Sequence, residues 1–86
     1  MNIQTFESSI CDFLRNELSG TRNLAVLKPD DSLFKLGVLD SLAVMRIVAF
    51  CEEEFDVAIP DEELIPDNFE TVHALARLIE RLKSSR

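Results

Sequence analysis

Apolar residues recur every three or four positions along three segments of this 86-residue chain, and this periodicity constrains its fold more than any other feature. Such spacing places apolar side chains on one face of a helix, so each segment predicts an amphipathic helix with one buried stripe. No segment shows the pattern of a strand. The predicted core stripes are Ile3, Phe6, Ile10, Phe13, Leu14 and Leu18; then Val44, Ile47, Val48, Cys51 and Phe55; and finally Val72, Leu75, Ala76, Ile79 and Leu82.

Proline, glycine and threonine mark the ends of these segments. Gly20 is suited to end the first helix, and Thr71 is suited to cap the last one. Pro60 and Pro66 both interrupt the pattern, so a short third helix is expected between them or at residues 67–70. The sequence therefore predicts an all-α fold, a small four-helix bundle with a long first loop and a short third helix.

The long first loop covers residues 21–38 and is unusually long for a structureless connection in a compact domain. Its apolar residues indicate that it lies along the core, and Asp31 or Ser32 could start one helical turn that runs through Leu36. The apolar residues in question are Leu24, Val26, Leu33, Phe34 and Leu36.

The charge of the chain is −7, and it is unevenly distributed. Residues 47–76 contain nine acidic residues and neither lysine nor arginine. This composition argues against nucleic acid as a partner, because phosphate contacts require basic side chains. It favours a partner with a basic surface; the alternative is a face that only keeps the protein soluble.

Length and cysteine usage limit the class of protein further. Eighty-six residues predict a single domain, which we expect to be a monomer. The spacing of Cys11 and Cys51 matches no disulfide framework, zinc site or redox motif, so both are expected to be buried in a protein from a reducing compartment. No secretion signal or membrane-spanning run is found. We therefore expect a cytoplasmic protein with no membrane partner.

The most informative local motif is Gly37–Leu42, at the start of the second predicted helix. Asp40 is suited to cap that helix, because its carboxylate can accept first-turn N–H groups and is favoured by the helix dipole. Ser41 then falls at the first helical position with its hydroxyl in solvent. Taken alone, this is an ordinary N-cap followed by a small polar residue.

The wider pattern resembles the phosphopantetheine-attachment region of acyl carrier and peptidyl carrier proteins. In that family glycine, one or two apolar residues and Asp-Ser-Leu precede a helix that ends in an acidic run, phenylalanine and Ile-Pro. The corresponding elements here are Gly37–Leu42, Glu52-Glu53-Glu54-Phe55 and Ile59-Pro60, and the likeness covers residues 3–83. The resemblance is to a free-standing carrier, and the stretch 64–72 is similar to carriers of specialised biosynthetic pathways.

This resemblance implies a cofactor and a set of partners. It implies that Ser41 receives covalent 4′-phosphopantetheine from coenzyme A through a phosphopantetheinyl transferase, and that the thiol of this arm holds an acyl or aminoacyl group as a thioester. It implies that Asp40 assists the modification by helping to organise a metal ion between carrier and transferase; the chain itself has no metal site. Further implied partners are a loading ligase or acyltransferase and downstream biosynthetic enzymes.

The residues themselves argue against catalysis by this chain. A catalytic serine needs a neighbouring base, and no such base stands near Ser41 in the sequence. His73 lies off the core stripe of the last helix and is expected to face solvent. We therefore expect Ser41 to be the substrate of another enzyme and the chain not to be an enzyme. The alternative is a carrier-like interaction module in which Ser41 stays unmodified.

A second apolar face on residues 41–55 is expected to contact partner enzymes. Leu42, Met45 and Ala49 lie away from the core stripe and lead away from Ser41. The charged residues around this face are Arg46, Glu52 and Glu53. The alternative is that loop residues cover the face. In fatty-acid carriers the positions of Ala43 and Arg46 are commonly acidic, so the resemblance to that subgroup is weaker here.

Overall fold

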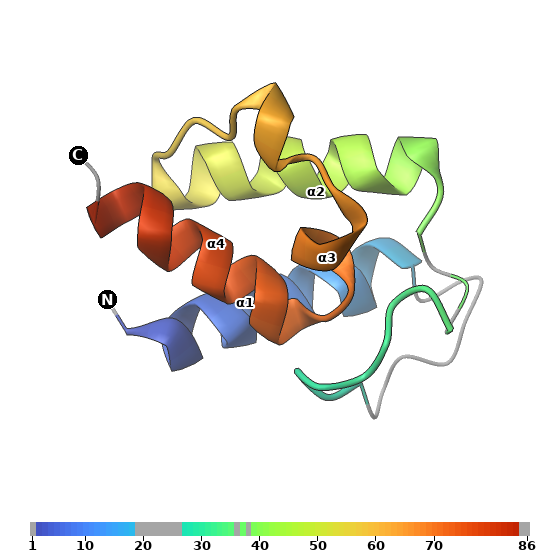
Figure 1. Ribbon diagram of the computed structural model, residues 1–86. Coiled ribbons are helices and arrows are strands. Elements are labelled where there is room, and N and C mark those ends of the chain that lie inside the picture. Colours follow the sequence, from blue (N-terminus) through green and yellow to red (C-terminus); the bar gives the residue numbers. More distant parts are fainter. Residues whose placement is uncertain (1, 19–26, 36, 38, 85–86) are drawn as a thin grey trace.

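The computed structural model describes residues 2–18, 27–35, 37 and 39–84, and all regular secondary structure within them is helical. Helix α1 covers Ile3–Leu18, α2 Ser41–Phe55, α3 Pro66–Phe69 and α4 Val72–Ser84. A 3-10 turn, η1, covers Asp61–Glu63. Figure 1 shows that α2 starts at the end of the molecule opposite to the start of α1 and the end of α4. The predicted all-α architecture with a short third helix is confirmed.

The three long helices bury their predicted stripes in one common core. Helix α4 packs closely against α1 and α3 (Figure 1). Some members of these stripes lie at the edge of the core and are only partly buried: Ile3, Phe13, Val44, Val48 and Leu82. The fully buried large side chains are Phe6, Ile10, Leu14, Leu33, Ile47, Leu75, Leu78 and Ile79. The side chain of Leu18, which was assigned to the first stripe, lies outside the described residues.

Helix α4 buries a wider face than its sequence indicates. Leu78 was not assigned to the core, yet it is completely buried. A single stripe is the expectation for a helix with one neighbour, whereas α4 packs against two. Contact with both α1 and α3 therefore explains the second row of buried side chains on this helix.

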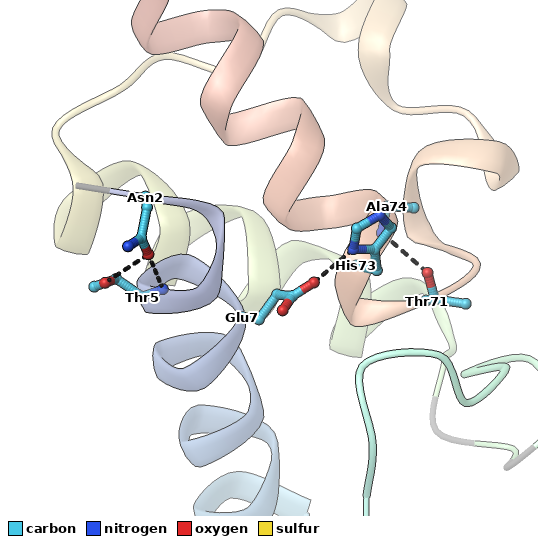
Figure 2. A network of polar contacts seen from close by, with 6 residues as sticks. All are labelled: Asn2, Thr5, Glu7, Thr71, His73 and Ala74. Carbon is cyan, nitrogen blue, oxygen red and sulfur yellow. Dashed lines mark hydrogen bonds and ion pairs between the residues drawn. The ribbon is translucent and has the colours of Figure 1, made fainter.

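Side-chain caps fix the starts of α1 and α4. The Oδ1 atom of Asn2 accepts hydrogen bonds from Thr5 N at 3.0 Å and from Thr5 Oγ1 at 3.2 Å (Figure 2). The Oγ1 atom of Thr71 accepts from Ala74 N at 2.9 Å, which confirms the predicted cap of the last helix. The bonds from Thr5 N and Ala74 N each pair an N–H group that the helix itself leaves without a partner.

The end of α2 is held by a left-handed cap residue and by two hydrogen bonds from other segments. Asp56 ends the helix in the left-handed conformation with φ 55°. The Nζ atom of Lys83 donates to Phe55 O at 2.8 Å, and Ile59 N donates to Glu52 Oε2 at 2.9 Å. These bonds satisfy polar groups where the helix ends, and they link α2 to both α4 and the following segment.

The long loop follows the core only in part. Leu33 is completely buried, as predicted. Leu27, for which no prediction was made, is 4% exposed. The prediction for Phe34 is wrong, because 44% of that residue is exposed. Ser32 begins a hydrogen-bonded turn, in which Lys35 N donates to Ser32 Oγ at 3.2 Å, and not a helix. The predictions for Gly20, Leu24, Val26 and Leu36 lie outside the described residues.

A short helical segment was expected either between Pro60 and Pro66 or just after Pro66, and the structure has one at each place. The 3-10 turn η1 lies between Pro60 and Pro66, and α3 begins at Pro66 itself. Proline is tolerated at a first helical position because its missing N–H would have no partner there. In the described part of the chain, no helix has the length and apolar character needed to cross a bilayer.

Placing a charge on the buried stripe of α2 should unfold or strongly destabilise the domain. Ile47 is 1% exposed, so Ile47→Glu would bury a carboxylate without a partner. We expect the free energy of unfolding to fall by about 3 kcal/mol or more, a large part of the stability of a small domain. A thermal melt followed by circular dichroism measures the effect. Ala49→Glu, on the exposed side of the same helix, is the matched control, and a melt unchanged by Ile47→Glu would contradict the assignment.

Candidate functional site

The candidate site is built on the first turn of α2. Asp40 has an extended backbone, φ −129° and ψ −179°, and precedes the helix as its N-cap. Its Oδ1 atom accepts from Ala43 N at 2.7 Å, and its carbonyl accepts the first helical hydrogen bond, from Val44 N at 2.9 Å. The capping geometry that the motif predicts is therefore present.

Ser41 is the first residue of α2 and is exposed. No hydrogen bond joins its hydroxyl to another residue that the structure describes. The cap and the helix fix the backbone of Ser41 on both sides, while its hydroxyl oxygen stays open to solvent. This geometry suits a group that a second macromolecule must reach.

The one histidine is engaged elsewhere. His73 Nδ1 lies 2.5 Å from Glu7 Oε2, in a contact that joins the start of α4 to α1 (Figure 2). The backbone N of His73 donates to Pro29 O at 3.0 Å. The expectation of a solvent-facing side chain holds in part, since 44% of the side chain is exposed, but the ring also pairs with a carboxylate. This contact could not be predicted from the sequence, because its partners are 66 residues apart.

The described residues contain no group of three or more histidine, cysteine or acidic side chains placed to hold a metal ion. The two cysteines are free and buried. Burial, reinforced by the charge of the adjacent Glu52, raises the pKa of the Cys51 thiol to about 12. Burial is also the main cause that raises the pKa of Cys11. Both thiols therefore stay protonated and shielded near neutral pH, where they are poor nucleophiles.

The apolar face next to Ser41 is open to solvent. Leu42 is 62% exposed and Met45 is 59% exposed, and Ala49 further along α2 is exposed as well. Ala43 belongs to the other side of the helix and is buried. Large exposed apolar side chains in a continuous row are unusual on a small domain and are typical of contact surfaces.

The charged residues next to this face have different environments. Arg46 Nη1 lies 3.2 Å from Glu17 Oε2 and so bridges α2 to α1. Glu53 is exposed, whereas Glu52 is partly buried and accepts from Ile59 N. One Glu52 oxygen is thus used to hold the end of α2. The sequence could not reveal this use, because the donor belongs to an irregular segment.

A groove of about 390 Å³ borders this face, between α1 and α2. The rings of Phe13 and Phe50 stack in its wall with their centres 4.2 Å apart. The sequence analysis does not predict this groove, because it places Phe13 on the core stripe of the first helix. Its lining residues are Phe13 and Glu17 from α1 and Arg46, Ala49, Phe50, Glu53 and Glu54 from α2.

Comparison with curated proteins finds carriers of acyl and aminoacyl groups. The chain is 40% identical over 52 residues to "Probable acyl carrier protein PigG" of Serratia sp., a match that spans 60% of each chain. It is 29% identical to aminoacyl carrier protein 2 of Bradyrhizobium diazoefficiens, over 85% of this chain and 81% of that protein. The chain thus spans less than two thirds of the first relative's length.

Comparison with solved structures finds the same fold. A chain in a crystal structure of an FAD-dependent dehydrogenase matches with a TM-score of 0.74 and 35% identity, over 83% of this chain and 99% of that one. The holo acyl carrier protein of Nitrosomonas europaea matches with a TM-score of 0.72 and 28% identity, over 93% and 96%. A third match is to a crystal structure of Bradyrhizobium japonicum glycine:[carrier protein] ligase complexed with glycylated carrier protein, with a TM-score of 0.66 and 29% identity, over 84% and 96%.

The family model for the phosphopantetheine attachment site matches residues 10–79, most of the chain and all of α2. The resemblance inferred from the Asp-Ser-Leu motif is thereby confirmed. The chain belongs to the phosphopantetheine attachment family and is a carrier protein, which holds its cargo as a thioester on covalently bound phosphopantetheine.

Proposed function

We propose that Ser41 is the residue that carries the phosphopantetheine. The observation that supports this most is the exposed hydroxyl at the first position of α2, held in place by the Asp40 cap. An accessible oxygen on a fixed backbone can reach the phosphorus of coenzyme A in the active site of another enzyme. In that transfer the serine oxygen forms the new bond to phosphorus, the bond to the nucleotide part of coenzyme A breaks, and the hydroxyl proton passes to a base.

The base for this step is proposed to belong to the phosphopantetheinyl transferase. Among the described residues the histidine of this chain pairs with Glu7, and both cysteines are buried and protonated. The chain is therefore proposed to act as a substrate and cargo carrier and not as an enzyme. Its benefit to partner enzymes is a high effective concentration of the tethered group, which depends on the arm and on docking.

An aminoacyl group is the cargo that the comparisons favour. The relatives include an aminoacyl carrier protein and D-alanyl carrier proteins, among them that of Streptococcus pyogenes, 33% identical over 54 residues. A structural relative carries glycine in a complex with its ligase. Arg46 also stands where fatty-acid carriers are commonly acidic. A carrier-protein ligase is thus the proposed loading enzyme; an acyltransferase that loads an acyl group is the alternative.

A downstream partner is suggested by the dehydrogenase structure. This chain covers 99% of the chain it matches there, so that matched chain is itself a domain of carrier size. The matched chain is too small to be an FAD-dependent dehydrogenase by itself. We infer that an FAD-dependent dehydrogenase, acting on the tethered cargo, belongs to the class of enzymes this carrier serves. A specialised biosynthetic pathway fits such a sequence of loading and oxidation.

The docking surface is proposed to be the exposed row of Leu42, Met45 and Ala49, together with Arg46 and Glu53 beside it. An enzyme that reaches the arm on Ser41 must approach this end of α2. The acidic residues nearby favour a partner with a basic surface. We also propose that the 86 residues act as one cytoplasmic, monomeric carrier domain. The competing function, an unmodified interaction module, would use the same face without the cofactor.

Replacing Ser41 with alanine should abolish modification without harming the fold. The side chain is exposed, so we expect the free energy of unfolding to change by less than ~1 kcal/mol. Intact-protein mass spectrometry after incubation with coenzyme A and a broad-specificity transferase measures the result. Ser9→Ala, on α1, is the matched control and should be modified normally. An unmodified wild-type chain would favour the interaction module, and a modified Ser41→Ala variant would place the arm on another residue.

Replacing Asp40 should separate its structural role from its role in modification. Asp40→Ala removes the bond to Ala43 N, so we expect a loss of about 0.5–2 kcal/mol in the free energy of unfolding. Asp40→Asn keeps an oxygen that caps equally well, so it should fold like the wild type while slowing modification. Chemical denaturation and modification rates are the two measurements. If Asp40→Asn is modified at the wild-type rate, the residue is only a cap.

Placing a charge on the docking face should weaken cargo transfer and spare the fold. Met45 is exposed, and a flexible thioether adapts well to differently shaped partners. Met45→Glu should leave the melting temperature nearly unchanged yet reduce transfer to or from partner enzymes about tenfold, which corresponds to ~1.4 kcal/mol. Loading kinetics with the cognate ligase are the measurement, and Met45→Leu is the control. Unchanged kinetics in Met45→Glu would mean that partners dock elsewhere.

A further inference from the structure

The turn at residues 32–35, which precedes α2 in the chain, is hydrogen-bonded to Glu70, the residue that follows α3. Leu33 N donates to Glu70 O at 2.8 Å, and the hydroxyl of Ser32 donates to the Glu70 carboxylate at Oε2. The two residues joined by this side-chain contact are 38 positions apart. The turn is thus fixed by a specific tertiary contact and not by local structure alone.

Ser32 links this contact to the shape of the turn. Its Oγ atom, which donates to Glu70, also accepts from Lys35 N at 3.2 Å. The following turn is closed by a bond from Gly37 N to Phe34 O at 3.1 Å, with Gly37 at φ 71°, where glycine is favoured. Loss of the Glu70 carboxylate would leave the Ser32 hydroxyl without this acceptor, and the turn would then be held by the backbone bond from Leu33 N to Glu70 O but no longer through Ser32.

The turn has one side chain in the core and presents the next one to solvent. Leu33 is completely buried, and Phe34 is among the exposed large apolar residues. Exposed aromatic side chains held by a rigid backbone are the usual anchors of protein contacts. Phe34 precedes Ser41 by seven residues, so the two lie within about 25 Å of each other. Figure 1 shows the turn at the same end of the molecule as the start of α2.

We propose that Glu70 is a positioning residue for the modification of Ser41: through Ser32 it holds the turn that presents Phe34 to the phosphopantetheinyl transferase. This proposal rests on the assignment of Ser41 as the modified residue. Because Glu70 acts by ordering a contact surface in advance, its loss should weaken carrier binding and leave the chemical step intact. The effect should therefore fall on KM and not on kcat.

The first test compares four proteins in the transferase assay, with carrier concentration varied and product measured by intact mass. Glu70→Ala should raise the KM for the carrier about fivefold at nearly unchanged kcat. Glu70→Gln should restore most of the loss, because its amide oxygen can still accept from Ser32. Asp67→Ala removes an exposed acidic side chain of α3 and should behave as wild type. An unchanged KM in Glu70→Ala, or an equal rise in Asp67→Ala, would overturn the proposal.

The second test asks whether Glu70 acts through Phe34. Phe34→Ala should raise KM, and Phe34→Ala/Glu70→Ala should raise it little further, because removal of Phe34 leaves Glu70 nothing to position. Effects of the two substitutions that multiply independently would contradict the link. Ser32→Ala removes this bond and also the bond from Lys35 N, so it should raise KM at least as much as Glu70→Ala; an unchanged KM in Ser32→Ala would overturn the proposal even if Glu70→Ala fails to fold. An unmodified wild type would refute Ser41 as the site; a modified wild type with unaffected variants would refute only the role of Glu70.

Discussion

Helix α2 is buried along one side only, and the arrangement of the site depends on this constraint. Ile47, Cys51 and Phe55 enter the common core, whereas Leu42 and Met45 stay in solvent. The asymmetry is possible because α4 packs closely with α1 and α3 and so completes the core from the other side. A helix that was surrounded would have no face left for a partner. The same packing that stabilises the domain therefore leaves the row beside Ser41 free for contacts.

Much of this could be predicted from the sequence, because the determinants are local. The bounds of α2, its Asp40 cap and the Thr71 cap follow from residue types at fixed spacing. What could not be predicted depends on distant segments. The burial of Leu78 requires knowing that α4 has two neighbours, and the Glu7–His73 pair joins residues far apart in the chain. Phe34 was misplaced because an apolar residue in a loop has no periodicity that assigns it a side.

The candidate site also has one part that could be predicted from local sequence and one part that depends on distant segments. The two adjacent residues to which we assign its chemistry, Asp40 and Ser41, have a geometry set by the first turn of a helix. Their motif was enough to identify the family. The surface around them is built from several elements: Arg46 pairs with Glu17 of α1, and Glu52 binds the backbone at Ile59. These contacts decide which charges remain available to a partner, and no spacing rule along one helix describes them.

A carrier differs from an enzyme in what its polar groups must achieve. Catalytic sites bury titratable groups and alter their pKa values to promote reaction. Here the groups with raised pKa are the two buried cysteines, and the result is the opposite, since a protonated and inaccessible thiol does not compete for a thioester. The one exposed nucleophile of the motif, Ser41, has no described base beside it. The two thiols are thus shielded from a tethered cargo, while the capped first turn of α2 and the open apolar row stay accessible to the partner enzymes that we propose.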